Sequence, residues 1–169
     1  MKLAILGLGK MGYNLTLNLL SHQHEVVAYD VDKSRAEELS REGAIPAASV
    51  EDAVAKLDAP RVIWLMVPAG EIVDQLVDQL SAILAPGDIV IDGGNSHYKQ
   101  SVERYERLKA NGIHFLDAGT SGGMEGARHG ACMMIGGDRE AFAHIEPMIR
   151  DINVDKGYLS TGDAGSSTE

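Results

Sequence analysis

Three glycines near the start of the chain, Gly7, Gly9 and Gly12, have the spacing G-x-G-x-x-G. They follow a short apolar run and open a segment with helical periodicity, and Asp30 lies 18 positions after the last glycine. In this context the first glycine permits a tight turn, the second lets the backbone approach a pyrophosphate, and the third lets a helix pack on a strand. Free N–H groups at the helix N-terminus then face the anion. The pattern predicts a dinucleotide site; the alternative is a structural turn without a ligand.

Asp30 indicates whether the predicted site would bind NAD or NADP. A carboxylate at this position accepts hydrogen bonds from both hydroxyls of an adenosine ribose, whereas a 2′-phosphate would meet like charge. At about 4 Å and an effective dielectric near 20, one such repulsion is on the order of 4 kcal/mol before screening. Val31 supplies no cation and Asp32 adds a second carboxylate, although Lys33 and Arg35 are close in sequence. We expect NAD rather than NADP. In the alternative interpretation, Asp30 only caps the following helix.

The elements that position these residues alternate between strand and helix patterns. Short apolar or β-branched runs predict strands at residues 2–6, 25–29, 61–67, 88–91, 113–116, 131–135 and 157–159. Helical spacing predicts helices at 11–20, 33–42, 72–84, 102–110 and 138–149, the last capped by Asp138. Such alternation favours parallel pairing through right-handed crossovers. We predict an α/β fold of the Rossmann type, a doubly wound, mostly parallel sheet with helices on both faces.

Composition excludes several classes of protein. The chain has 169 residues, with 15 Lys+Arg against 25 Asp+Glu, so its net charge is −10 and a nucleic-acid partner is not expected. Cys132 is the one cysteine, which excludes an intramolecular disulfide and a cysteine-rich metal site. The longest apolar run, residues 62–67, is far too short to span a membrane, and the start does not resemble a signal peptide. We expect a cytoplasmic protein with one domain over residues 1–160 and a polar tail over 161–169.

The histidines are weaker candidates. His22 and His24 are two residues apart at a predicted helix-to-strand junction, so their side chains point apart and we expect both on the surface without a metal. His114 lies inside a predicted strand. His129 follows a glycine-rich segment and is interpreted as a solvated loop residue, with a place at a substrate mouth as the alternative. We predict no metal site.

Two further segments carry a family resemblance: residues 91–96, IDGGNS, and residues 117–127, DAGTSGGMEGA. Together with the glycine turn they resemble 6-phosphogluconate dehydrogenase, the decarboxylating enzyme, over nearly the whole chain and in the family's order. The S-G-G-x-x-G-A segment is shared by the wider β-hydroxyacid dehydrogenases. The D-G-G-N-S segment marks the 6-phosphogluconate branch, whereas hydroxyisobutyrate-type relatives carry D-x-S-T there.

The resemblance implies roles for individual residues. Met11 matches a methionine near the nicotinamide, and residues 67–69 match a loop that lies along the cofactor. Asn95 matches an asparagine that contacts substrate and nicotinamide. The implied substrate-binding residues are Asn95, Ser121, Gly122 and Gly123, for 6-phosphogluconate. The predicted cofactor-binding residues are Gly7, Gly9, Lys10, Met11, Gly12, Asp30, Val67, Pro68, Ala69 and Asn95. Taken without the resemblance, Ser-Gly-Gly is equally a simple turn and Asn95 the start of an Asx turn.

The sequence also departs from the family. Met124 stands where many members have a glutamate, and Glu125 is not an automatic substitute. The family's catalytic lysine lies in a G-x-x-G-x-G-x-x-x-K stretch, which here begins at Gly162, has Ser167 for the third glycine and stops at Glu169. The acid glutamate, the phosphate-binding residues and the dimer interface of relatives lie further on. We therefore expect no catalytic residue within the chain, an inactive isolated chain, and a homodimer only for a longer form.

Three functional hypotheses follow. The first is the cofactor domain of an NAD-dependent enzyme that oxidises and decarboxylates 6-phosphogluconate to ribulose 5-phosphate. The second is another β-hydroxyacid dehydrogenase, against which Asn95 in D-G-G-N-S argues. The third is a dinucleotide-binding module without catalysis, against which the retained Ser121-Gly122-Gly123 segment argues, since such a module needs no substrate loop.

Overall fold

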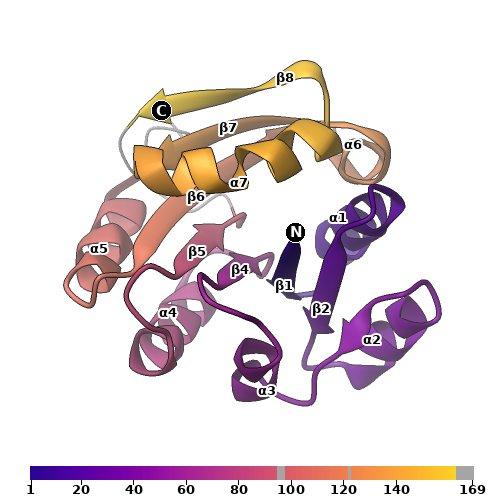
Figure 1. The fold of residues 1–169 in the computed structure, drawn as a ribbon, viewed down its shortest axis with the longest axis horizontal. Coiled ribbons are helices and arrows are strands. Elements are labelled where there is room, and N and C mark those ends of the chain that lie inside the picture. The colour runs from indigo at the N-terminus through magenta and orange to yellow at the C-terminus, as the bar shows by residue number, and fades with distance from the viewer. Residues whose placement is uncertain (95–97, 122, 163–169) are drawn as a thin grey trace.

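A computed structural model describes residues 1–94, 98–121 and 123–162. Within these residues one sheet runs in the order β3-β2-β1-β4-β5-β6-β7-β8, and β8 forms one of its edges (Figure 1). The strands are β1 (Lys2–Leu6), β2 (Glu25–Tyr29), β3 (Ile45–Pro46), β4 (Val62–Leu65), β5 (Ile89–Asp92), β6 (His114–Ser121), β7 (Ala131–Gly137) and β8 (Asn153–Gly162). The predicted Rossmann-type α/β fold is confirmed.

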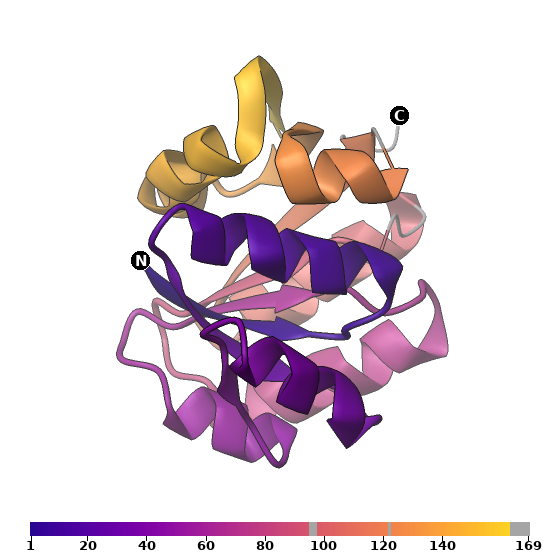
Figure 2. The ribbon, with the colours of Figure 1, turned by 90° about the vertical axis from the view of Figure 1, so that its right-hand side faces the viewer.

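Helices cover both faces of the sheet. They are α1 (Lys10–Ser21), α2 (Lys33–Ser40), α3 (Val50–Ala55), α4 (Glu71–Ile83), α5 (Tyr98–Lys109), α6 (Gly123–His129) and α7 (Arg139–Ile152). Apolar side chains of α1, α2 and α7 form one core with one face, and those of α3, α4 and α5 form a second core with the other. Figure 2 shows these two layers, with α6 lying against α1. In the described part of the chain, no helix combines the length and apolar character of a membrane span.

The sheet's order reverses direction between β1 and β4. Leu6, the last residue of β1, pairs in parallel register with Tyr29 of β2 on one side and with Leu65 of β4 on the other. The loops that leave β1 and β4 therefore diverge to opposite faces, and the crevice between them is where doubly wound sheets bind ligands. β5 and β6 continue the parallel pairing, so their carboxyl ends lie along the same edge.

Several elements differ from the sequence predictions. β3 was not predicted because it has two residues and ends in Pro46. α3 was also missed, although Ser49 accepts a hydrogen bond from the Asp52 N–H, a recognisable helix start. β6 extends beyond the predicted residue 116 to Ser121, and α6 forms in a glycine-rich segment that we read as a loop. The β6–β7 pair is antiparallel, which the alternating pattern does not predict.

The last strand also changes the boundary of regular structure. β8 begins at Asn153 rather than at residue 157 and continues to Gly162, two residues into the segment assigned to a polar tail. Residues 163–169 lie outside the described part. The cap of α7 is as predicted, because the Asp138 carboxylate accepts a hydrogen bond from the Glu140 N–H at 2.9 Å.

Candidate functional site

The glycine turn between β1 and α1 shows a different physical requirement at each glycine. Gly7 has φ of +103°, and a Cβ there would lie 2.7 Å from the Met66 carbonyl oxygen. A Cβ at Gly12 would collide with the Gly7 carbonyl oxygen. At Gly9, φ is −66° and the nearest described atom to a Cβ is Arg35 Nη1, at 3.9 Å. Packing and backbone strain therefore explain Gly7 and Gly12 but not Gly9.

Gly9 leaves the N-terminus of α1 open. It is the N-cap residue of α1 and has no side chain to accept a hydrogen bond, and the first intrahelical bond runs from the Tyr13 N–H to the Gly9 carbonyl at 2.8 Å. The N–H groups of the first turn have no partner within the helix, and they sum with the helix dipole to favour an anion. A pyrophosphate fits here because nothing in the turn blocks its approach.

Asp30 holds the turn in place. Its Oδ2 accepts a hydrogen bond from the Leu8 N–H at 2.6 Å, and its Oδ1 accepts one from the Asp32 N–H at 2.8 Å. A carboxylate has about four lone-pair positions, so two remain for the hydroxyls of a ribose. The capping alternative is wrong, because the N-cap of α2 is Asp32, whose side chain accepts from the Ser34 N–H at 3.1 Å.

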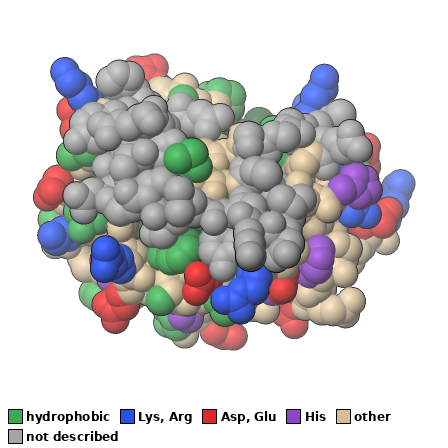
Figure 3. Space-filling view, turned by 90° about the horizontal axis from the view of Figure 1, so that it is seen from above, with side chains coloured by type: hydrophobic (Ala, Val, Ile, Leu, Met, Phe, Trp, Pro, Cys, Tyr) green, Lys and Arg blue, Asp and Glu red, His purple; other side chains and the backbone are tan. Residues whose placement is uncertain are grey.

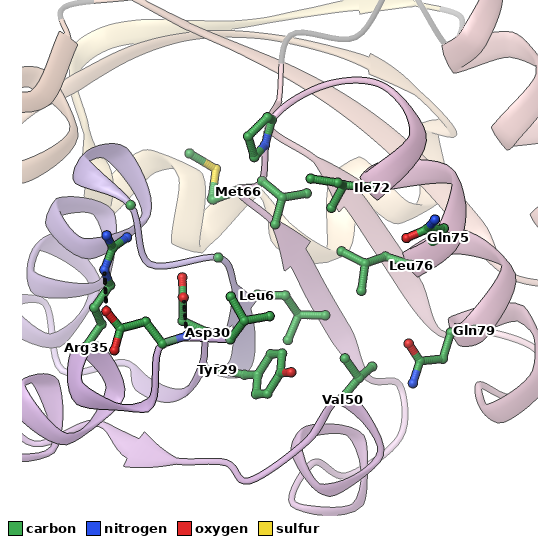
Figure 4. A pocket seen from close by; sticks show the side chains of 16 residues that line it. Leu6, Tyr29, Asp30, Arg35, Val50, Met66, Ile72, Gln75, Leu76 and Gln79 are labelled. Atoms are coloured by element: carbon green, nitrogen blue, oxygen red, sulfur yellow. Dashed lines mark hydrogen bonds and ion pairs between the residues drawn. The ribbon is translucent and has the colours of Figure 1, made fainter.

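A pocket of about 600 Å³ lies beside this turn, at the crevice between β1 and β4 (Figure 4). Gly7, Gly9 and Asp30 line it together with Val67 and Pro68, all of which the sequence singled out. In the close-up, Asp30 and Arg35 stand on one side and the side chains of α4 on the other. The pocket thus has a charged wall at the glycine turn and a wall of apolar and amide side chains at α4.

Charges at the pocket mouth are largely paired with one another. Arg35 Nε lies 3.6 Å from Asp32 Oδ2, and Arg35 Nη1 donates to the Leu8 carbonyl at 3.3 Å. Hydrogen bonds from the Ser34 hydroxyl and N–H, with the Arg35 charge, hold the pKa of Asp32 below its usual value. Val31, between the two acids, is 89% exposed and offers only apolar contact.

A second pocket of about 440 Å³ lies on the outer side of the same turn, between α1 and α2. Lys10, Tyr13 and Glu38 line it. Burial and the neighbouring Glu38 carboxylate raise the pKa of the Tyr13 phenol above its usual value. Met11 is half-buried in the first turn of α1. The structure thus places Lys10 in the first turn of α1, at the N-terminus of the helix.

The loop after β5 lies against the loop after β4. A Cβ on Gly93 would lie 2.6 Å from Trp64 Nε1 and would collide with Met66 Sδ. A Cβ on Gly94 would lie 2.6 Å from the Val67 carbonyl oxygen. These two close approaches explain the paired glycines of the D-G-G-N-S segment. Ala69, which the sequence assigned to the cofactor, is exposed in the loop after β4.

The predicted substrate residues sit at the carboxyl ends of neighbouring strands, as far as they are described. Asn95 lies outside the described residues and follows Gly94 directly. Ser121 is the last residue of β6, Gly122 lies outside the described residues, and Gly123 begins α6. Because β5 and β6 are parallel, both segments leave the sheet at the same edge as the glycine turn.

The histidines are placed differently from one another. The surface prediction for His24 is wrong: its side chain is 8% exposed, and its Nε2 lies 2.8 Å from Asp151 Oδ2 at the end of α7. His22 is exposed, His129 ends α6 in solvent, and His114 Nδ1 lies 2.8 Å from Asp138 Oδ2. In the described part of the chain, no three His, Cys, Asp or Glu side chains gather as a metal site would require.

The α4 wall of the pocket was missed by sequence reasoning. Ile72, Gln75, Leu76 and Gln79 of α4 line it, with Val50 at the start of α3. Ile72 is 48% exposed, and the residues of α4 that are fully buried are Val73, Val77 and Leu80. The sequence did contain a signal for this wall, because the apolar residues of α4 form a stripe wider than a single buried helix face requires.

Charged side chains of both signs lie on the face seen from above. There the described Lys and Arg side chains are spread singly among acidic ones (Figure 3).

Comparison with known proteins identifies relatives along almost the whole chain. Residues 2–157 match the family described as the NAD binding domain of 6-phosphogluconate dehydrogenase. YqeC of Bacillus subtilis (strain 168), named as a 6-phosphogluconate dehydrogenase, is 50% identical over 166 residues, which are 98% of this chain and 56% of YqeC. 6-Phosphogluconate dehydrogenase, decarboxylating 1, of Saccharomyces cerevisiae is 46% identical over 154 residues, 88% of this chain and 32% of the yeast protein.

A solved structure agrees with these matches. The 6-phosphogluconate dehydrogenase of Plasmodium falciparum, studied in apo form and with NADP⁺ or 6-phosphogluconate, superimposes with a TM-score of 0.93 at 29% identity. The match covers 99% of this chain and 38% of that one. The chain therefore spans about half, or less, of the length of the relatives it matches.

Proposed function

The chain belongs to the 6-phosphogluconate dehydrogenase family, and from that premise we propose that it is the domain that holds NAD while 6-phosphogluconate is oxidised and decarboxylated to ribulose 5-phosphate. The observation that carries the cofactor part is Gly9, whose missing side chain leaves the N-terminus of α1 open and has no other structural reason. Bound NAD supplies the acceptor for a hydride from the carbon that bears the substrate hydroxyl.

The proposed binding mode follows the walls of the pocket. The turn from Gly7 to Gly12 and the N-terminus of α1, with Lys10 beside it, bind the pyrophosphate. Asp30 accepts from the ribose hydroxyls through its two remaining lone-pair positions. Ile72 and Leu76 cover the adenine side. The nicotinamide half then extends toward Met11, Val67, Pro68 and Ala69, in front of the loop that leads to Asn95.

The residue types at the substrate end suit a polyhydroxy acid. An asparagine amide and a serine hydroxyl both donate and accept, so Asn95 and Ser121 can bind hydroxyl and carboxylate oxygens. Gly122 and Gly123 let backbone N–H groups approach the carboxylate closely. These residues bind and orient; the general base and acid, and a homodimer interface, are proposed for a longer form of the protein.

The charges at the pocket mouth support NAD over NADP. A 2′-phosphate would enter between the carboxylates of Asp30 and Asp32, and Arg35, the nearest cation, is already paired with Asp32 and bonded to the Leu8 carbonyl. Replacing these contacts would offset part of the gain from a new Arg–phosphate pair. NAD has no 2′-phosphate, so its binding does not require Arg35 to give up these contacts.

Two measurements test the proposal. Calorimetric titration of the chain with NAD⁺, NADH, NADP⁺ and NADPH at one salt concentration should give tighter binding of the non-phosphorylated pair. A longer form that includes the C-terminal segment should produce NADH and CO₂ from 6-phosphogluconate and not from 3-hydroxyisobutyrate. Turnover of the second substrate would favour another β-hydroxyacid dehydrogenase, and cofactor binding without oxidation of either would favour a non-catalytic module.

A further inference from the structure

The most deeply buried cation of the described chain lies behind the site rather than in it. Arg104, on α5, has a fully buried side chain. Within the described part of the chain, its guanidinium contacts three groups: Nε lies 2.9 Å from Asp74 Oδ1, Nη1 lies 3.3 Å from Asp92 Oδ2, and Nη2 donates to the Gly70 carbonyl at 3.2 Å. Arginine is almost never fully buried unless it is paired, because desolvating the charge is costly. The three contacts account for its burial and raise the question of what they hold.

Two of the partners belong to the loops that flank the proposed nicotinamide end. Asp92 is the last residue of β5, and its Oδ1 accepts a hydrogen bond from the Gly94 N–H at 2.9 Å. Gly70 ends the loop after β4 and is the N-cap of α4, with φ of +118°. Arg104 therefore connects the turn that precedes Asn95 with the loop that begins at Val67.

The two loops also contact each other directly. Gly94 approaches the Val67 carbonyl so closely that a Cβ would lie 2.6 Å from it, and Gly93 packs on Trp64 and Met66. A shift of either loop would therefore disturb the other, since packed atoms at these distances leave no room to slide. The guanidinium contacts a residue of each segment, Asp92 and Gly70, from the buried side.

We propose that Arg104 is a positioning residue, which sets the place of the turn before Asn95 relative to the loop at residues 67–70 and so aligns the nicotinamide half of the cofactor with the substrate site. This assignment rests on the proposed function, because that function gives the two loops their ligands. Arg104 touches no ligand itself. Its planar fork serves three acceptors in different directions, which a lysine ammonium cannot reproduce.

The same pair of helices provides a matched control. Arg107, one turn further along α5, pairs with Asp78 of α4 at 2.8 Å, just as Arg104 pairs with Asp74. Both residues of this second pair are exposed, at 41% and 67% of the side chain, and their ion pair joins α5 to α4 without involving either loop. Arg107→Met therefore tests what is lost when α5 and α4 lose one ion pair.

The first experiment compares the two halves of the cofactor. Titrations of wild type, Arg104→Lys and Arg107→Met with ADP and with NADH report the adenosine half and the whole cofactor, and NADH fluorescence reports the nicotinamide environment. For Arg104→Lys we expect ADP affinity within about twofold of wild type, NADH affinity lower by roughly tenfold, and a changed NADH emission. Arg107→Met should match wild type in all three.

A double variant tests the same proposal without leaving an unpaired buried charge that could unfold the chain. Arg104→Met leaves Asp92 buried without its charge partner, so it is combined with Asp92→Asn, which removes both charges. This variant should bind ADP normally and NADH as weakly as Arg104→Lys, because the link to Gly70 is gone. Amide exchange of Gly94 in the ligand-free chain should accelerate about tenfold or more in Arg104→Lys and stay unchanged in Arg107→Met.

The outcomes separate the proposals. Unchanged NADH affinity and Gly94 exchange in a folded Arg104→Lys chain would overturn the positioning role while leaving the cofactor function intact. An equal loss for ADP and NADH would assign Arg104 a merely structural role and overturn it as well. If wild type binds neither ligand, the proposed function fails, and the alignment proposal fails with it.

Discussion

Each of the three glycines in the first turn meets a different physical requirement. Gly7 adopts a positive φ against the backbone at Met66, and Gly12 lets α1 pack on the Gly7 carbonyl. Gly9 has neither constraint, so its lack of a side chain matters for what enters the pocket. The sequence motif predicted the tight turn at Gly7 and the close packing at Gly12, because each role is tied to the position of the glycine relative to strand and helix.

Alanine substitutions should separate the roles of Gly9 and Gly12. Gly9→Ala is expected to change the free energy of unfolding by less than about 1 kcal/mol, since its Cβ would make only an ordinary contact with Arg35 Nη1, at 3.9 Å. It should weaken NADH binding by about 1–3 kcal/mol, the usual cost of overpacking a close contact. Gly12→Ala should instead destabilise the fold. Thermal melts and NADH titrations of both variants check this, and intact NADH binding by a folded Gly9→Ala chain would contradict the cofactor assignment.

Asp30 should control the choice between the two cofactors. We expect Asp30→Ala to narrow the difference in binding free energy between NAD⁺ and NADP⁺ by at least about 1 kcal/mol, the scale of a hydrogen bond to a charged group. Calorimetry at fixed salt measures both ligands. Asp78→Asn, which removes one exposed acidic charge on α4, is the control for net charge. Equal or tighter NADP⁺ binding by wild type would refute the preference itself.

At the scale of elements, the sequence predicted strands and helices correctly where the apolar pattern was long or had sharp ends. β1 and β2 have the bounds that their apolar runs indicated, because a glycine or an aspartate ends each run. α6 was read as a loop since glycine is a poor helix former, yet its contacts with α1 outweigh that propensity. The antiparallel β7 and the role of α4 as a pocket wall depend on tertiary placement, which local periodicity does not encode.

The cap of α7 predicts a pH dependence. Partial burial raises the pKa of Asp138, but hydrogen bonds from His114 and from the Glu140 N–H outweigh it and hold the pKa below its usual value. The ionised carboxylate therefore stabilises the fold above its unfolded pKa of about 3.9, and this stabilisation is lost as pH falls through the lower folded value.

Asp138→Asn isolates this effect, because asparagine caps a helix about as well as aspartate but does not ionise. Thermal melts between pH 5 and pH 2.5 should show that the variant loses less stability on acidification than wild type. Glu140→Gln, in the first turn of the same helix, should follow wild type. Identical acid profiles for wild type and Asp138→Asn would contradict the assigned pKa shift.

At the scale of the whole molecule, the sheet gathers all the proposed ligand contacts at one edge. The turn after β1, the loop after β4 and the segments after β5 and β6 leave parallel strands at their carboxyl ends, so residues more than 100 positions apart come to one crevice. The family motifs predict this arrangement from sequence. The buried network of Arg104 could not be read there, because α5 shows only an ordinary charged helix pattern until its neighbours are known.

Also at the scale of the whole molecule, cofactor binding and turnover depend on different parts of the protein. The sheet and the glycine turn are present in these 169 residues, so we expect the chain to bind NADH. Oxidation also requires a general base that takes the hydroxyl proton, and such a base typically contributes 10²–10⁴-fold in rate. The family resemblance implies a lysine base in the segment that begins at Gly162, whereas the last lysine of this sequence is Lys156.

The purified chain, mixed with NAD⁺ and 6-phosphogluconate, should therefore form no NADH above background, measured by absorbance, while the same sample binds added NADH. A longer form assayed in parallel serves as the positive control. NADH formation that scales with the concentration of the 169-residue chain would refute this expectation, and it would require a base among the residues described above.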